Sequence, residues 1–199
     1  MKAYSGFSRE RTGKVKIPPL PAGAYVAKIK AAKIEGQEPD QWLILRVDVA
    51  EGEHTGYFLE RYNNDKENSK FEPRYKGDYK FRIPNDENTK APYPESDVKT
   101  FNNFVYCIEK SNEDFVWSFD YSEQEVSKLM AGKLIGINMQ EGEMNGYPYT
   151  KIGKLEVVDD VRKGLVKPMK KIQPRGDAYE PPVDQQTGFI GVEVSDLPF

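Results

Sequence analysis

The feature that most constrains the fold is a strict alternation of apolar and polar side chains between residues 41 and 51. One set is Leu43, Leu45, Val47 and Val49, and the intervening set is Trp42, Ile44, Arg46 and Asp48. A period of two places successive side chains on opposite faces of a strand, so the first set predicts the buried face of a sheet. Trp42, on the other face, predicts either a ring covered by another element or a platform for stacking, and covering is the commoner arrangement.

Other stretches have the same period. Residues 22–34 predict a strand with Tyr25, Ala27, Ile29 and Ala31 on one face and Val26, Lys28 and Lys30 on the other. Residues 56–62 are rich in aromatic side chains and predict a third strand. Residues 75–83 predict a fourth strand, with Tyr75, Tyr79, Phe81 and Ile83 on one face and Lys76, Lys80 and Arg82 on the other. Residues 133–140 and 149–158 predict a hairpin around Asn145-Gly146, which is a strong turn signal.

Residues 97–110 predict one long amphipathic helix. Val98, Phe101, Val105 and Ile108 form a continuous apolar stripe along it. Ser122 with Glu125 is a capping-box signature that predicts a short helix up to Met130, and residues 159–164 predict a helical turn. Strands, then a helix, then two strands is the order of an OB-fold, so we expect a mainly β protein with an OB-fold-like, partly open Greek-key barrel.

The composition suggests one folded domain with appendages. We expect a basic N-terminal arm at 1–21, the OB-like domain at 22–164, a basic and then Pro/Gly-rich linker at 165–192, and an acidic tip at 193–199. With one Cys and one His, the chain predicts no disulfide, no zinc site, no metal and no cofactor. No apolar run reaches the length of a membrane span, and the N-terminus does not read as a signal peptide, so we expect no membrane association and a cytoplasmic location.

Charge is divided along the chain. From residue 176 onward there are five acids and no Lys or Arg, whereas residues 162–175 hold six bases and no acid. Residues 2–33 hold eight bases and one acid. A basic body with an acidic tail is typical of a protein that binds an anion, although unevenly distributed surface charge is the alternative.

Binding of single-stranded nucleic acid requires a basic groove for phosphates and exposed rings for bases. The candidate nucleic-acid-binding residues combine both kinds of side chain at strand spacing: Lys28, Lys30, Trp42, Arg46, Tyr57, Phe58, Arg61, Tyr62, Arg74, Tyr75, Tyr79, Arg82, Tyr147, Tyr149 and Lys151. Alternation tells which of these share a face but not which face meets solvent. The alternative for each ring is packing in the core.

The last seven residues, 193–199, end in Asp196-Leu197-Pro198-Phe199 after an acidic Glu193. A terminal Phe places a ring beside the free carboxylate, which a partner can hold with an apolar pocket and a basic rim. This ending resembles the tip of bacterial single-stranded DNA-binding proteins (SSBs), although the family's usual run of aspartates is missing. The resemblance implies an OB-fold that binds DNA and a tip that recruits replication, recombination and repair enzymes. The alternative is a terminus that has no partner.

Catalytic motifs are absent from the sequence: it has no Gly-rich phosphate loop, no Gly-x-Ser-x-Gly and no His/Cys cluster. We therefore expect a non-enzymatic SSB-like protein of a phage or prophage, acting in a bacterial cell and able to form homo-oligomers. One alternative is a β-rich phage interaction module that does not bind DNA. Another is an enzyme of nucleic-acid metabolism, with paired acids such as Asp159-Asp160 as metal ligands.

Overall fold

The computed structural model describes residues 17–68, 72–87, 94–144 and 146–172. The strands are β1 (Gly23–Glu35), β2 (Trp42–Val49), β3 (Asp78–Arg82), β4 (Leu134–Met144) and β5 (Tyr147–Glu156). The helices are α1 (Tyr57–Asn68), α2 (Pro94–Ser111), α3 (Glu123–Met130) and α4 (Val158–Arg162). The predicted tip, most of the predicted linker and residues 1–16 of the predicted arm lie outside the described residues.

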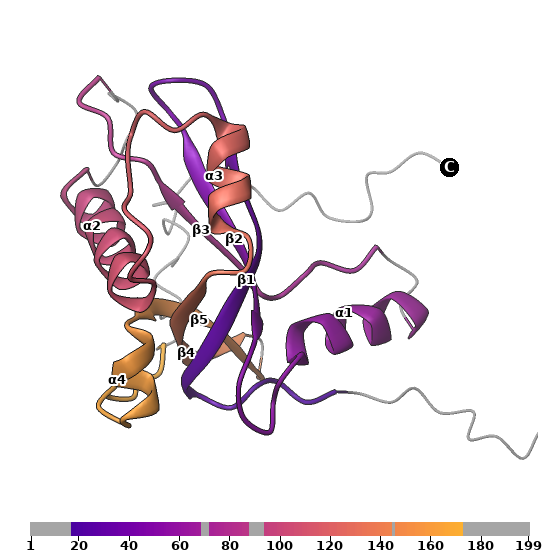
Figure 1. Cartoon of the computed structure of the whole chain (residues 1–199). Coiled ribbons are helices and arrows are strands. Elements are labelled where there is room, and N and C mark those ends of the chain that lie inside the picture. Colours follow the sequence, from indigo (N-terminus) through magenta and orange to yellow (C-terminus); the bar gives the residue numbers. More distant parts are fainter. Residues whose placement is uncertain (1–16, 69–71, 88–93, 145, 173–199) are drawn as a thin grey trace, which may run out of the picture.

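The five strands form one antiparallel sheet in the order β3-β2-β1-β4-β5. β1 lies in the middle and runs the length of the sheet (Figure 1). Within the described residues the edge strands β3 and β5 do not pair with each other, so the sheet is not closed into a barrel. The part of the chain that the structure describes is therefore mainly β, with several helices around an open sheet.

Helix α2 lies across the opening between the two edge strands. On one side, Phe101 and Phe104 pack against Phe81 of β3, with ring centroids 6.0 and 5.1 Å apart. On the other side, Asn103 Nδ2 and Cys107 Sγ both donate to the Leu155 carbonyl oxygen of β5, at 2.9 and 3.4 Å. The side chains of α2 thus cover the gap between β3 and β5, which no backbone hydrogen bonds close in the described part of the chain.

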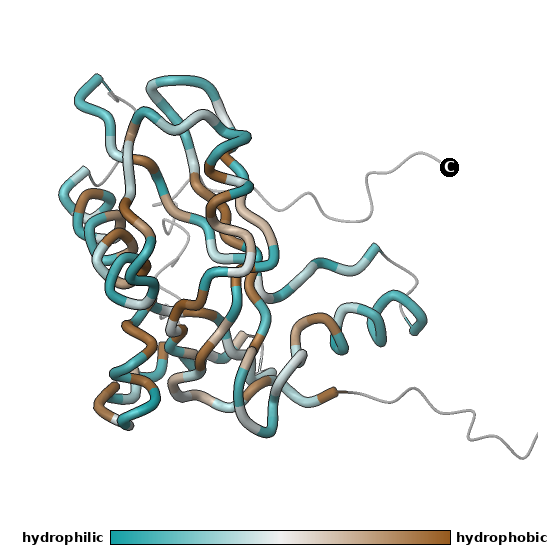
Figure 2. Tube along the Cα trace, in the orientation of Figure 1, coloured by the Kyte–Doolittle hydropathy of each residue, from teal (hydrophilic) through white to brown (hydrophobic). Residues whose placement is uncertain are grey.

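The inward faces of the strands make the core, as the alternation predicts. Leu43, Leu45, Val47, Ile135 and Ile137 have no exposed surface. Apolar residues follow the strands and the inner faces of α2 and α3, whereas α1 turns hydrophilic after its first turn (Figure 2). The core thus lies between the sheet and the two helices α2 and α3, and α1 contributes only its beginning.

Several local predictions are confirmed. The strands at 22–34, 41–51 and 75–83, the final hairpin and the helix at 97–110 are all present, with bounds shifted by a few residues. The capping box is formed: Ser122 Oγ accepts from the Glu125 backbone N–H, and the Glu125 carboxylate accepts from the Ser122 N–H at 2.9 Å. A fold with one long helix is not supported, because four helices lie within the described residues, and α1 is the one among them that was not predicted.

The predicted third strand at 56–62 is also wrong, since these residues begin helix α1. Gly56 has φ +79°, a left-handed conformation that turns the chain out of β2. The buried carboxylate of Asp48, on β2, then accepts the backbone N–H of Phe58, a donor that a first helical turn leaves unpaired. No Val, Ile or Thr occurs between 57 and 68, and that absence is the local signal against a strand.

The predicted face of Ala31 is wrong as well. The register between β1 and β2 shifts between Ile29 and Ala31, which marks a bulge. The extra residue reverses the alternation, so Ala31 is exposed and Ala32 is buried. Lys30 lies within this bulge and is exposed.

The segment after α4 packs on the outer side of β4. Asn138 and Gln140 donate to the carbonyl oxygens of Lys167 and Lys170, at 3.0 and 2.7 Å, and the Ile172 N–H donates to the Glu141 carbonyl at 2.8 Å. The first residues of the predicted linker therefore belong to the fold.

Candidate nucleic-acid interface

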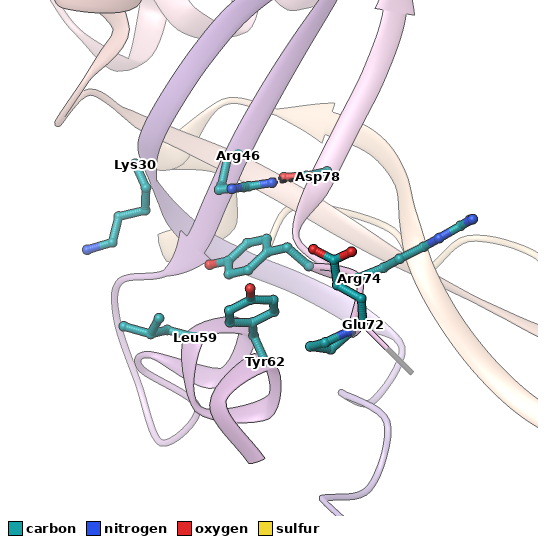
Figure 3. Close-up of a pocket in the computed structure, with 9 residues that line it drawn as sticks. Lys30, Arg46, Leu59, Tyr62, Glu72, Arg74 and Asp78 are labelled. Atoms are coloured by element: carbon teal, nitrogen blue, oxygen red, sulfur yellow. Dashed lines mark hydrogen bonds and ion pairs between the residues drawn. The ribbon is translucent and has the colours of Figure 1, made fainter. Parts of the chain in front are cut away.

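A cleft of about 860 Å³ lies between helix α1 and the outer face of strands β1 to β3. We call it the α1 cleft. It is lined by Lys30, Arg46, Leu59, Tyr62, Glu72, Pro73, Arg74, Tyr75 and Asp78 (Figure 3). Five of these are candidate residues from the sequence, and they come from four separate stretches of the chain. Three cations and two carboxylates line it, so its own charge is weakly positive.

Arg46 is the centre of the cleft. Its guanidinium makes a two-pronged pair with Asp78, Nε to Oδ1 at 2.8 Å and Nη2 to Oδ2 at 2.9 Å. The two residues are directly opposite across β2 and β3, which brings both side chains to the same face. The guanidinium also lies 4.8 Å from the centroid of the Tyr75 ring, a cation–π arrangement. The hydrogen bonds to Asp78 raise the pKa of Arg46, so the charge is permanent.

Tyr75 is held firmly in place. Its hydroxyl donates to the Val47 carbonyl oxygen at 3.1 Å. Burial is the main cause that raises the pKa of this phenol, and the Asp48 and Asp78 carboxylates add to it. With Arg46 over its ring and a fixed hydroxyl, Tyr75 forms a wall of the cleft and is poorly placed to accept a base.

Tyr62, on α1, is the better placed ring. It is half-buried, and its centroid lies 5.9 Å from that of Tyr75, with the planes inclined by 56°. Leu59, one helical turn earlier, leaves 46% of its surface exposed. In Figure 3 both side chains rise from α1 on the side of the cleft opposite Arg46 and Asp78. An apolar ring beside an apolar side chain, facing a guanidinium, can receive a flat aromatic group.

The two remaining cations of the cleft are Lys30 and Arg74, and both are exposed. Neither makes an ion pair with a carboxylate among the described residues, whereas Arg46 is paired with Asp78. Arg74 extends outward at the rim in Figure 3. Lys28, on the same strand as Lys30, is exposed too but does not line the cleft. Lys30 and Arg74 are therefore the cations most available to an incoming anion.

Trp42 lies further along the same sheet face and is covered by cations. Lys80 Nζ is 5.0 Å and the Arg82 guanidinium carbon 4.4 Å from its ring centroid. Arg82 is also paired with Asp40 and, at 3.8 Å, with Asp97. Covering is thus the arrangement that the structure shows for Trp42.

Four of the candidate residues point into the protein. Tyr57 and Phe58 are buried in the first turn of α1, and Tyr79 packs against Phe81 with centroids 5.5 Å apart. Arg61 is half-buried and donates to the Tyr57 hydroxyl at 2.8 Å. The structure gives these side chains a packing role, and we leave them out of the interface.

The hairpin residues Tyr147, Tyr149 and Lys151 lie on β5, three strands away from β2 in the sheet. Tyr147 is 76% exposed, and Met144, its partner on β4, is 68% exposed. Tyr149 is half-buried, with its ring over the β4 backbone at Gly142. These residues do not line the α1 cleft.

Sequence reasoning missed Leu59, Glu72, Pro73 and Asp78 as parts of the cleft. The spacing of Tyr57, Phe58, Arg61 and Tyr62 by one, four and five residues is helical, and it would have placed Leu59 on the same helix. The partnership of Asp78 with Arg46 depends on the register of β2 and β3, which no local pattern gives.

The described residues contain no group of three or more His, Cys, Asp or Glu side chains able to hold a metal ion. Burial raises the pKa of the Cys107 thiol to about 12, which removes it as a nucleophile. In the described part of the chain, no helix is both long and apolar enough to cross a membrane.

No protein-family model matches the chain, and no curated protein matches it either.

Proposed function

We propose that this protein binds single-stranded DNA without sequence preference and that the α1 cleft is where a base and its neighbouring phosphates sit. The observation that carries the proposal is the joining of Tyr62 with Lys30, Arg46 and Arg74 in one open cleft. An aromatic ring can stack on any base, because every base has a π-face, and the cations bind the phosphates of the backbone. A cleft built in this way distinguishes a single strand, whose bases are free, from a duplex, whose bases are stacked.

The proposal includes an OB-like fold. Its support is the order of elements along the chain, together with the central place of β1 in the sheet. Strands β1, β2 and β3 come first, with α1 between β2 and β3, then α2 and α3, then β4 and β5. In OB-folds oligonucleotides bind over the second and third strands. Arg46 and Asp78 of the α1 cleft belong to β2 and β3.

The test is a titration of labelled oligo-dT with the protein, followed by fluorescence anisotropy at several salt concentrations, beside a duplex of equal length. We expect tighter binding to the single strand. The logarithm of affinity should fall linearly with that of salt, by about 0.7 per phosphate contacted. Equal affinity for both DNAs would overturn the proposal.

Recruitment of replication, recombination or repair enzymes by the C-terminal tip completes the proposed function. Its support is the sequence Asp196-Leu197-Pro198-Phe199 alone. Deleting residues 193–199 should leave oligo-dT affinity unchanged and abolish capture of such an enzyme by the protein–DNA complex. A large loss of DNA affinity on deletion would contradict this division of labour.

The second candidate is a non-catalytic β-rich interaction module that does not bind DNA. The observation that favours it is the pairing of cations within the sheet face: Arg46 with Asp78, and Arg82 with Asp40. A cation already neutralised by a carboxylate attracts phosphate less. The same titration decides, because this candidate predicts no salt-dependent affinity for oligo-dT.

A further inference from the structure

A second cleft, of about 430 Å³, lies at the end of the sheet where β1 turns into β2. We call it the distal cleft. Apolar walls come from Ile34, Ile83, Pro84 and Val126, and the aromatic loop that follows α2 supplies Trp117 and Phe119. Phe119, which lines the cleft, is 68% exposed, and Val116 of the same loop is 69% exposed, so this loop presents apolar side chains to solvent. Exposed apolar surface concentrated at the mouth of a cleft marks a place where another chain docks.

The charge of the distal cleft selects its occupant. Two exposed carboxylates, Glu38 and Glu123, line it, and none of the described lining residues is Lys or Arg. Asp120 and Asp86 follow lining residues directly in the sequence and are exposed. The occupant should therefore combine apolar anchors with positive charge, which excludes the acidic residues 176–199 of this chain.

One segment of the chain has that composition. Residues 1–16 carry five bases, Lys2, Arg9, Arg11, Lys14 and Lys16, against the single acid Glu10. Tyr4 and Phe7 lie among them and supply two rings. Rings and Arg are the side chains that most often anchor a docked segment. We propose that the distal cleft binds the segment 1–16 of a second copy of this chain.

The length of the N-terminal segment indicates whether the distal cleft is filled by the same chain or by a second copy. The chain enters the fold at the far end of the sheet, where the Leu20 carbonyl accepts from Thr150 and the Pro18 carbonyl from Tyr57, both at 2.7 Å. Figure 1 shows this entry at the bottom and the β1–β2 turn with α3 at the top. From Gly23 to Ile34 the strand β1 covers up to about 36 Å at 3.3 Å per residue.

The ten residue steps from Phe7 to Ile17 span at most about 36 Å when fully extended. Phe7 of the same chain would thus reach the cleft only at full extension, where the loss of chain entropy is greatest. A neighbouring copy carries no such constraint. The docking links one copy to the next, and it does not depend on the proposed DNA binding.

The experiment places the photoreactive residue p-benzoylphenylalanine at position 7 of the full-length protein and irradiates it without DNA. We expect a covalent dimer on a denaturing gel, with the cross-linked peptides mapping to residues 34–41 or 116–126. The dimer should diminish at about 1 M salt, where the screening length falls to about 3 Å. Cross-links only within one chain, or only to another surface, would overturn the proposal.

A charge swap supplies the matched control. Glu38→Lys with Glu123→Lys should abolish the dimer, whereas Glu60→Lys with Asp160→Lys, which changes the net charge equally at exposed sites elsewhere, should retain it. Adding Arg9→Glu and Arg11→Glu to the photoreactive chain should restore cross-linking to the Glu38→Lys, Glu123→Lys partner. An unchanged dimer in that partner, or no restoration by the swap, would contradict the proposed contact.

Discussion

The carboxylate of Asp48 accepts the backbone N–H of Phe58 at 2.9 Å, and through this bond strand β2 holds the beginning of helix α1. The same oxygen accepts the Val49 N–H at 3.0 Å, and only 4% of Asp48 is exposed. A negative charge at a helix N-terminus is also favoured by the helix dipole. Because α1 provides Tyr62 and Leu59, this buried carboxylate sets one wall of the α1 cleft.

Replacing Asp48 by Ala should lower the free energy of unfolding by about 2–6 kcal/mol, because two buried N–H donors lose their acceptor at about 1–3 kcal/mol each. Asp48→Asn keeps an acceptor oxygen and should lose less. Urea denaturation of both variants measures the difference. Equal stability of Asp48→Ala and the unmodified protein would show that α1 is held by something else.

Lys30 should contribute to DNA affinity through phosphate alone, since it makes no ion pair with a carboxylate among the described residues. Lys30→Gln should therefore reduce the slope of log affinity for oligo-dT against log salt by about 0.7, the value of one phosphate contact on a single strand. Lys110→Gln, at the exposed end of α2, is the control and should leave the slope unchanged. Identical slopes for the two variants would remove Lys30 from the interface.

Cys107 should report on unfolding. It is 2% exposed, so a reagent cannot reach it in the folded protein. Burial also raises the pKa of its thiol to about 12, so the reactive thiolate does not form at neutral pH. We expect a chromogenic thiol reagent at neutral pH to react with it only in denaturant, with a midpoint that matches the loss of secondary structure. Rapid reaction in buffer without denaturant would mean that α2 separates readily from β5.

High pH should destabilise the fold through its tyrosines. Burial raises the pKa of Tyr75 and of Tyr79 above the ordinary value of about 10, so above pH 10 the folded state holds protons that the unfolded state has lost. This part of the stability is complete below about pH 10 and is lost as the pH rises toward the higher folded pKa values. Urea midpoints measured at about pH 8 and pH 11 should show this decrease in stability. The decrease should be smaller in the Tyr75→Phe variant than in the Tyr106→Phe variant, which serves as the control.

The parts of the fold that could be predicted are those with a local cause. The alternation of Leu43 to Val49 identifies β2, the Ser122–Glu125 box begins α3, and Asn145-Gly146 identifies the hairpin. Helix α1 has local signals too, namely the spacing of its aromatic residues and the absence of Val, Ile and Thr. The place where it begins depends on Asp48, which lies nine residues before the first helical residue and on another element. The bulge that exposes Ala31 is likewise a property of the pairing with β2.

The candidate site, too, has some features that the sequence predicts and others that depend on contacts between distant segments. Composition identified the cations and rings, and five of them do meet in the α1 cleft. Which rings are open to solvent was not predictable, since Trp42 is covered by Arg82 and Tyr75 by Arg46, and in both pairs the residues are far apart in the sequence. The opposing carboxylate of Asp78 depends on strand register, and it lowers the positive charge that composition suggests.

The most direct measurement of the central claim compares the oligo-dT affinity of Tyr62→Ala with that of Tyr106→Ala. Tyr106 is 57% exposed on α2 and does not line the α1 cleft, so it controls for the loss of a surface ring. A stacked base contributes about 1–3 kcal/mol, so Tyr62→Ala should weaken binding about 5- to 160-fold while Tyr106→Ala leaves it unchanged. Equal affinities for the two variants would contradict the α1 cleft as the DNA-binding site.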